Sequence, residues 1–199
     1  MSRLVIATTN AGKIIEIRSA LGELPGWSLG PVPENTPSIP ETGATFLDNA
    51  ILKAEHYSKL VNDLTLADDS GLCVDALGGR PGVHSARYAP DPPSRIKRIL
   101  EEMRLVPNGE RNAVFFCALA VARAGTIIWT VQRDVAGVIT HTASGTGGFG
   151  YDPLFMVPEY GKTLAELPLE IKNRISHRGR AAEALKAYLV KNGLIQSKA

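Results

Sequence analysis

The residues best suited to chemistry are two neighbouring carboxylates, Asp68 and Asp69, which follow a short apolar run. Adjacent carboxylates repel each other when both are ionised, so a cation or hydrogen-bond donors must compensate their charge. Magnesium is bound by one or two carboxylates together with waters and phosphate oxygens. The pair is therefore suited to a magnesium site, to which Glu41 and Lys53 could add a ligand and a second cation. An acidic turn before Gly71 is the alternative, and this feature alone does not decide between the two.

A second candidate site is the segment 10–13, Asn-Ala-Gly-Lys, where an apolar run gives way to a helical pattern. Backbone N–H groups at the start of a helix, together with the helix dipole, bind anions. Gly12 lets the backbone approach a ligand closely, and Lys13 adds a positive charge. The segment lacks the two glycines, separated by four residues, of the P-loop. A phosphate-binding turn of another kind would fit these residues, but the segment alone does not indicate one.

Two later segments suit the recognition of a base. The loop 145–152 has four glycines around Phe149 and Tyr151. Stacking of an aromatic side chain on a base contributes about 1–3 kcal/mol of binding free energy. A loop that served only as a flexible linker would not need Phe149 and Tyr151. Ser-His-Arg-Gly at 176–179 opens the last expected helix, where Arg178 in the first turn opposes the helix dipole and so indicates an outside partner.

Alternating helices and strands must position these residues. Apolar runs predict strands over 4–7, 64–67, 113–124 and 126–139, the last two joined by a hairpin turn. Helices are expected after 13, after the capping box of Thr45 and Asp48, over 94–104, and before Gly193.

Loops and connections are expected where proline and glycine gather. The proline-rich segment 25–40 predicts an extended connection, and the glycine-rich segment 78–82 predicts a loop. Thr163 and Glu166 repeat the capping pattern of Thr45 and Asp48. Because helices and strands interleave, the predicted class is α/β with a mixed sheet.

The composition is that of an ordinary globular protein. The chain has 199 residues, of which 44% are hydrophobic and 21% are charged. The net charge of +2 is too small to indicate a nucleic-acid partner. Cys73 and Cys117 lie in apolar runs without metal-ligand spacing, which predicts reduced, buried side chains. With neither a signal-peptide pattern nor an apolar stretch long enough to span a bilayer, we expect a cytoplasmic protein without a membrane partner.

Six motifs together resemble the inosine triphosphate pyrophosphatase family, also described as dITP/XTP pyrophosphatases. They lie at residues 7–13, 41–46, 67–72, 81–88, 145–152 and 175–179, in order over nearly the whole chain. The resemblance implies a Mg²⁺-dependent enzyme that hydrolyses ITP, dITP and XTP to the monophosphate and pyrophosphate, and so cleans the nucleotide pool. It also implies an elongated mixed sheet flanked by helices, in one domain (1–199) of two lobes with the active-site cleft between them. Members are usually homodimers.

The family's functional residues can be carried over by position. Asp69 would be the general base and a metal ligand, with Glu41 and Asp68 as the other acidic ligands. The residues implied in substrate binding are Thr8, Thr9, Asn10, Ala11, Gly12, Lys13, Lys53, Ser70, Arg87, Phe149, Gly150, Tyr151, Asp152, Lys172, His177 and Arg178.

Two positions depart from the family pattern. Position 9 is often glycine, whereas Thr9 is β-branched and should avoid a positive φ. Many members have two acids before Thr-Gly, whereas this chain has Pro40-Glu41, which leaves the second metal ligand open.

Two other functions remain open at this point. One is a pyrophosphatase for other modified nucleotides, and the other is a nucleotide sensor or RNA-binding module without turnover. Asp68 and Asp69 argue against a sensor, because carboxylates near phosphates repel the ligand unless a metal ion intervenes.

Overall fold

The protein is described by a computed structural model that covers residues 2–61 and 63–195. The strands are β1 (Ser2–Ile6), β2 (Trp27–Pro31), β3 (Leu64–Val74), β4 (Asn112–Arg123), β5 (Thr126–Ile139), β6 (Phe155–Val157) and β7 (Lys162–Thr163). The α-helices are α1 (Ala11–Leu21), α2 (Phe46–Val61), α3 (Pro92–Glu102), α4 (Leu169–Ile175) and α5 (His177–Lys191). Three short 3₁₀ helices lie at Asp75–Leu77, Gly82–Arg87 and Asp152–Leu154.

The strands form a mixed sheet in the order β2-β1-β3-β4-β5-β6-β7. β1 pairs in parallel with β2 and β3, whereas β6 pairs antiparallel with β5 and β7. The expected hairpin between β4 and β5 turns on Ala124 and Gly125, whose φ values of 49° and 81° are those a tight hairpin turn requires. The predicted α/β class with a mixed sheet flanked by helices is confirmed.

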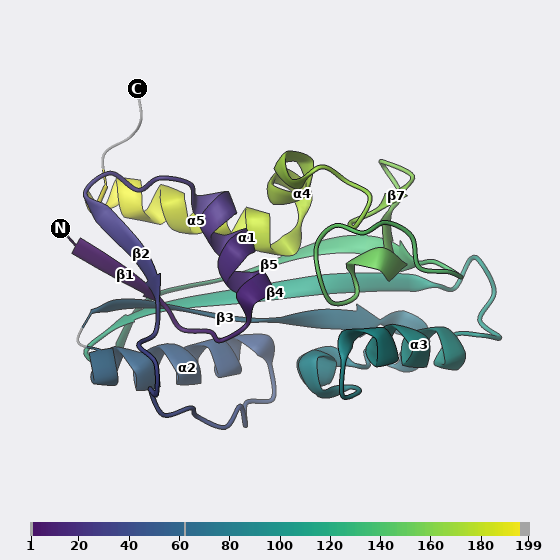
Figure 1. Cartoon of the computed structure of the whole chain (residues 1–199), viewed down its shortest axis with the longest axis horizontal. Coiled ribbons are helices and arrows are strands. Elements are labelled where there is room, and N and C mark those ends of the chain that lie inside the picture. The colour runs from purple at the N-terminus through teal and green to yellow at the C-terminus, as the bar shows by residue number, and fades with distance from the viewer. Residues whose placement is uncertain (1, 62, 196–199) are drawn as a thin grey trace. The chain divides into compact units, whose positions relative to one another are not determined.

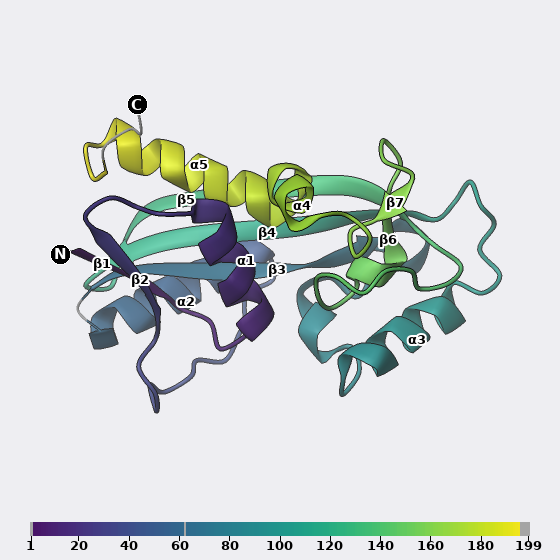
Figure 2. The ribbon, with the colours of Figure 1, turned by 45° about the horizontal axis from the view of Figure 1, so that its top comes forward.

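The chain separates into two compact units. The first unit comprises the residues up to Asp69, Cys117–Arg133 and the residues from Arg178, and the second comprises Ser70–Phe116 and Asp134–His177. In the first unit α2 covers one face of the strands, and α1 and α5 cover the other (Figures 1 and 2). The expectation of one two-lobed domain over 1–199 stays a prediction.

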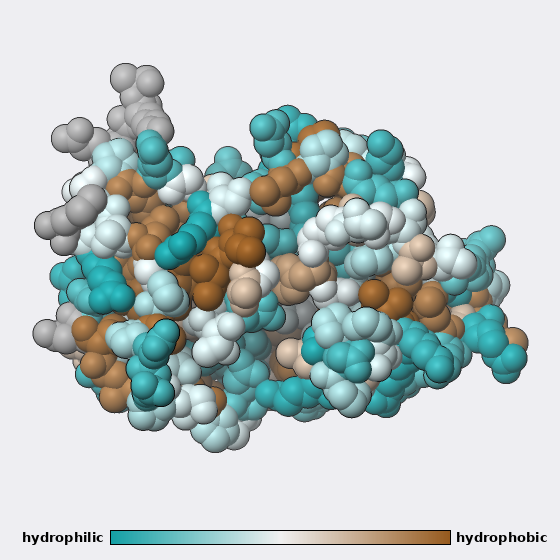
Figure 3. Space-filling view, in the orientation of Figure 1, coloured by the Kyte–Doolittle hydropathy of each residue, from teal (hydrophilic) through white to brown (hydrophobic). Residues whose placement is uncertain are grey.

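Each unit has its own apolar core. In the first unit Ile17 of α1 and Leu185 of α5 are fully buried, as their helical spacing predicts. In the second unit Phe155 and Ile99 are fully buried. The outer face of α1 also carries apolar side chains (Figure 3), where Ile15 is 62% exposed. Within the described ranges, no helix combines the length and apolar character that crossing a membrane would require.

The two capping patterns have different outcomes. At the start of α2 the box forms, because the Asp48 N–H donates to Thr45 Oγ1 and the Thr45 N–H donates to Asp48 Oδ2, both over 3.1 Å. The Thr163 N–H likewise donates to Glu166 Oε2 over 2.8 Å, but no helix begins there. Thr163 Oγ1 instead donates to the Ser144 carbonyl over 2.8 Å, which fixes this residue at the end of β7.

Two strand predictions need correction. β3 does not end at Ala67 but continues through both aspartates to Val74. The segment 25–40 is not wholly an extended connection, because Trp27–Pro31 forms β2 and pairs with β1. β2 is the terminal strand of the sheet, where proline is tolerated because one edge has no ladder to complete.

Candidate active site

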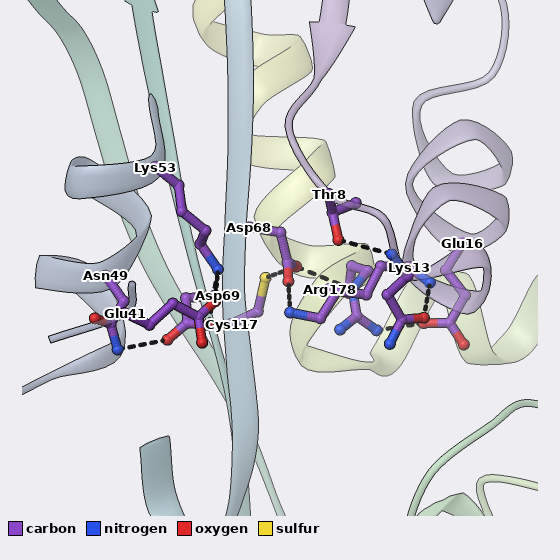
Figure 4. A network of polar contacts seen from close by, with 11 residues as sticks. Thr8, Lys13, Glu16, Glu41, Asn49, Lys53, Asp68, Asp69, Cys117 and Arg178 are labelled. Carbon is purple, nitrogen blue, oxygen red and sulfur yellow. Dashed lines mark hydrogen bonds and ion pairs between the residues drawn. The ribbon is translucent and has the colours of Figure 1, made fainter. Parts of the chain in front are cut away.

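Asp68 and Asp69 lie next to each other in β3 but face opposite sides of the sheet (Figure 4). Successive side chains of a strand alternate between its faces. Asp68 therefore meets residues of α1 and α5, and Asp69 meets residues of α2. The two carboxylates therefore make separate sets of hydrogen bonds and ion pairs.

Asp68 is the fully buried anionic centre of a cluster of charged side chains. Its Oδ1 lies 2.5 Å from Lys13 Nζ, and its Oδ2 accepts from Arg178 Nε over 3.1 Å and from Cys117 Sγ over 3.2 Å. Arg178 Nη1 also binds Glu16. Burial alone would raise the pKa of Asp68, but the charges of Lys13 and Arg178 hold it far below its ordinary value. Asp68 therefore stays ionised and anchors two cations.

Asp69 is held at both oxygens by α2. Lys53 Nζ lies 3.0 Å from Oδ1, and Asn49 Nδ2 donates to Oδ2 over 3.2 Å. Lys53 also donates to Glu41 Oε1 over 2.7 Å, so two carboxylates converge on one ammonium group. Burial raises the pKa of Asp69, and the charge of Lys53 offsets only part of that rise. Burial would lower the pKa of Lys53, but Asp69 and Glu41 together raise it.

The segment between β1 and α1 forms the predicted turn. Asn10 is the N-cap of α1, and its Oδ1 accepts the Lys13 N–H over 3.2 Å. Thr8 Oγ1 accepts the Asn10 N–H over 3.2 Å, which orders the chain just before the cap. The N–H groups at positions 11 and 12 have no acceptor within the helix and are placed to bind an anion. Thr9 has a negative φ, as its β-branched side chain predicts.

A buried ion pair orders the glycine-rich loop of the second unit. Lys172 Nζ lies 2.6 Å from Asp152 Oδ2, and both side chains are at most 5% exposed. The same Oδ2 accepts the Phe149 N–H over 2.7 Å, and Lys172 Nζ lies 5.8 Å from the centre of the Phe149 ring. A Cβ on Gly148 would come within 2.1 Å of Asp152 Oδ2, so only glycine fits beside this pair.

Two other candidates of the second unit are buried against supporting residues. The Tyr151 hydroxyl donates to the Ser85 carbonyl over 2.9 Å, and Tyr151 is 4% exposed. The His177 ring stacks on Phe115, with ring centres 4.7 Å apart and planes 9° from parallel. Both contacts fix the orientation of the side chain that makes them.

The structure divides the sequence-predicted residues between the two units. The first unit holds Thr8, Thr9, Asn10, Ala11, Gly12, Lys13, Glu41, Lys53, Asp68, Asp69 and Arg178. The second unit holds Ser70, Arg87, Phe149, Gly150, Tyr151, Asp152, Lys172 and His177. Their roles stay predictions, including that of Arg178, whose buried side chain binds carboxylates here. No group of three or more His, Cys, Asp or Glu side chains with metal-site geometry occurs among residues 2–61 and 63–195.

Sequence reasoning missed three residues of the first unit's cluster. Glu16 binds Arg178, Cys117 donates to Asp68, and Asn49 donates to Asp69. A signal existed only for Asn49, which precedes Lys53 by four residues and so lies on the same face of α2.

Comparisons with known proteins agree with these motifs over almost the whole chain. The model of the Ham1 family matches residues 4–188. The chain is 47% identical to the dITP/XTP pyrophosphatase of Geobacter sulfurreducens, over 98% of this chain and 100% of that protein. It is 45% identical to the dITP/XTP pyrophosphatase of Bacillus subtilis, over 95% of this chain and 98% of that protein. A solved HAM1 protein from Coxiella burnetii superposes with a TM-score of 0.86 at 38% identity, covering 96% of this chain and 100% of the other. This chain belongs to the Ham1 family.

Proposed function

We propose that this protein hydrolyses non-canonical purine nucleoside triphosphates, namely ITP, dITP and XTP, to the nucleoside monophosphate and pyrophosphate. The observation that carries the proposal is the setting of Asp69, a buried carboxylate held by Lys53 and Asn49 with Glu41 on the same ammonium group. Similarity to dITP/XTP pyrophosphatases over their full length supports the same function.

The charge of the cluster supports a requirement for Mg²⁺. The charged side chains around Asp68 and Asp69 together carry one excess negative charge. Four are carboxylates, namely Glu16, Glu41, Asp68 and Asp69, and three are cations, namely Lys13, Lys53 and Arg178. A triphosphate adds several more negative charges, so a further cation must accompany it. Glu41 and Asp69 suit this ion, because their oxygens already converge on one positive group and Mg²⁺ needs only one or two protein carboxylates. When bound there, Mg²⁺ would neutralise charge on the phosphate oxygens.

The reaction is attack of water on the α-phosphorus. Asp69 accepts the proton of the attacking water, for which its raised pKa is suited. A bond forms between the water oxygen and the α-phosphorus, and the bond to the bridging oxygen breaks, so that pyrophosphate leaves. Lys13 and the N–H groups at the start of α1 stabilise the departing phosphates, while Asp68 holds Lys13 in place.

The second unit supplies candidates for recognising the base. The Phe149 ring offers a face for stacking, and Lys172 and His177 offer hydrogen-bond donors. Asp152 fixes the position of the Lys172 ammonium group. Donors suit the 6-oxo group of inosine and xanthosine, whereas the 6-amino group of adenine would leave buried donors unpaired.

Product analysis tests the proposal. With Mg²⁺ present, we expect ITP to give IMP and pyrophosphate, and ITP, dITP and XTP to be turned over with a higher kcat/KM than ATP. IDP and phosphate as main products would refute attack at the α-phosphorus. Turnover confined to modified pyrimidine nucleotides would favour a pyrophosphatase for other modified nucleotides. Nucleotide binding without pyrophosphate release would favour a nucleotide sensor.

The homodimer and the cytoplasmic location are also part of the proposal. The homodimer rests on the resemblance to the family, and light scattering of the purified protein at several concentrations tests it. The location rests on the substrate, because the nucleotide pool that such an enzyme cleans lies in the cytoplasm; fractionation of the producing cells tests it.

A further inference from the structure

Asn49 is a fully buried polar residue in the first turn of α2. Its side chain is 0% exposed. A buried amide without hydrogen-bond partners would cost free energy. Here the amide is engaged on both sides. Oδ1 accepts the Gly43 N–H over 2.7 Å, and Nδ2 donates to Asp69 Oδ2 over 3.2 Å.

The partners of Asn49 fix which way its amide faces. The Gly43 N–H can only donate, so the amide oxygen must face it. The amide nitrogen must then face Asp69, whose ionised carboxylate can only accept. The same side chain thus connects Asp69 with the segment that carries Glu41, two residues before Gly43.

The contact at Gly43 leaves no room for adjustment. A Cβ at this position would lie 2.6 Å from the Cβ of Asp48 and 2.8 Å from Asn49 Oδ1. The backbone at Gly43 therefore packs directly against the start of α2. A shift of the Asn49 amide would move this backbone as well as the carboxylate.

We propose that Asn49 is a positioning residue that fixes the carboxylate of Asp69 for proton transfer and ties it to the segment carrying Glu41. Asn49 acts only through these partners and does not touch the nucleotide. Lys53, one helical turn later, binds the other oxygen of Asp69, so the carboxylate has one defined orientation instead of rotating about its Cβ–Cγ bond. The inference rests on the proposed function, because it assigns Asp69 the role of base.

A double-mutant cycle with Asn49→Ala and Asp69→Asn tests this role. We expect Asn49→Ala to lower kcat for ITP by about 10- to 100-fold, the effect of losing a hydrogen bond to a charged group. KM should change less than about threefold, because no binding contact is removed. In the Asp69→Asn background the same substitution should lower kcat less than about threefold, since the group through which it acts is already gone. Equal losses in both backgrounds would overturn the inference.

Thr45→Ala is the matched control. It removes the hydrogen bond from the Asp48 N–H at the start of the same helix and leaves the partners of Asn49 in place. We expect it to lower Tm while kcat stays within about twofold of the wild type. A kcat loss as large as that of Asn49→Ala would mean that destabilising α2 is sufficient, which would overturn the inference.

Asn49→Asp provides a readout that is independent of turnover and serves if Asn49→Ala fails to fold. This near-isosteric change keeps an acceptor for the Gly43 N–H but sets a second carboxylate against Asp69, so Tm should fall. Adding Asp69→Asn restores a donor and acceptor in reversed order, and Tm should recover. Absence of recovery would overturn the direct coupling.

The two proposals fail in different ways. No pyrophosphate release from any substrate by the wild type would refute the proposed function. Wild-type turnover that Asp69→Asn abolishes, together with unchanged kcat in Asn49→Ala, would refute the role of Asn49 alone.

Discussion

Asp68→Asn should destabilise the protein strongly although it removes only one charge. Asp68 is 0% exposed and compensates Lys13 and Arg178. Asparagine has nearly the same size, so packing is preserved and the effect isolates electrostatics. Removing one partner of a buried ion pair leaves an uncompensated charge in a medium that cannot solvate it, which typically costs about 3–5 kcal/mol.

The surroundings of Asp68 place the expected cost at the lower end of this range. The Lys13 side chain is 13% exposed and can turn its ammonium group towards water. Arg178, with a side chain only 4% exposed, cannot do so but keeps its second partner, Glu16. We therefore expect a loss of about 3 kcal/mol, which in a chain of this size lowers Tm by about 6–12 °C.

Thermal unfolding at pH 7 measures this effect, with Asp63→Asn as the control. Asp63 pairs with Arg3 over 3.8 Å with both side chains over a third exposed, so its loss should cost less than about 1 kcal/mol. The folded-state pKa of Asp68 is lowered, so its contribution is complete above the unfolded-state pKa of 3.8 and is lost as pH falls further. The gap between wild type and Asp68→Asn should therefore narrow below pH 3.8. A Tm change at pH 7 no larger than that of Asp63→Asn would refute the reasoning.

Three further substitutions test the site. Asp69→Asn keeps the shape of the side chain but removes the proposed general base, so kcat for ITP should fall roughly 10²–10⁴-fold. Near-normal turnover at saturating Mg²⁺ would mean that another residue is the general base. Arg178→Ala should lower kcat/KM for ITP and ATP by the same factor, because its guanidinium binds carboxylates in the structure. A loss confined to ITP would instead indicate that Arg178 contacts the purine base. Gly148→Ala should lower Tm and kcat/KM for ITP more than Gly161→Ala, since both have φ near +60° but only at 148 would a Cβ strike Asp152.

The long strands and amphipathic helices could be predicted from the sequence because periodicity reports burial directly. The end of β3 could not. Asp-Asp-Ser-Gly is typical of a turn, since two charges and a glycine disfavour a strand interior. β3 nevertheless continues through Asp68 and Asp69, because cations from three other elements compensate their charges. No local pattern in the sequence contains these tertiary partners.

The capping pattern at Thr163 does not begin a helix, for a related reason. The reciprocal pattern of a capping box needs only a hydroxyl and a carboxylate three residues apart. At Thr163 the hydroxyl instead donates to the carbonyl of Ser144, just before the glycine-rich loop, and Pro168 lies where a helix would have to continue. The same two-residue pattern thus precedes a helix at Thr45 but lies at the end of β7 at Thr163. The difference between the two sites lies in the tertiary partners of the hydroxyl, which the two-residue pattern does not contain.

The motifs in the sequence indicated the residues of the candidate site, but the arrangement of partners could not be predicted from them. Asn49 had a usable signal in its helical spacing from Lys53. Cys117 and Glu16 had no such signal. Cys117 lies in an apolar strand and Glu16 faces the core from a helix, and neither pattern indicates that the residue contacts a buried carboxylate or guanidinium. Residues whose task is to hold another functional group are therefore the ones that sequence reasoning misses most easily.

The alternation of β3 explains how two adjacent aspartates can differ in chemistry. On one face Lys13 and Arg178 lower the pKa of Asp68, so it cannot take up a proton near neutral pH. On the other face burial raises the pKa of Asp69, and the charges of Lys53 and Lys13 offset only part of that rise. Carboxylates whose surroundings push their pKa values apart divide into a fixed charge and a group able to exchange protons. A shift of one residue in the register of β3 would exchange the two faces, so the pairing of Leu64 with Leu4 of β1 also sets which aspartate can serve as the proposed base.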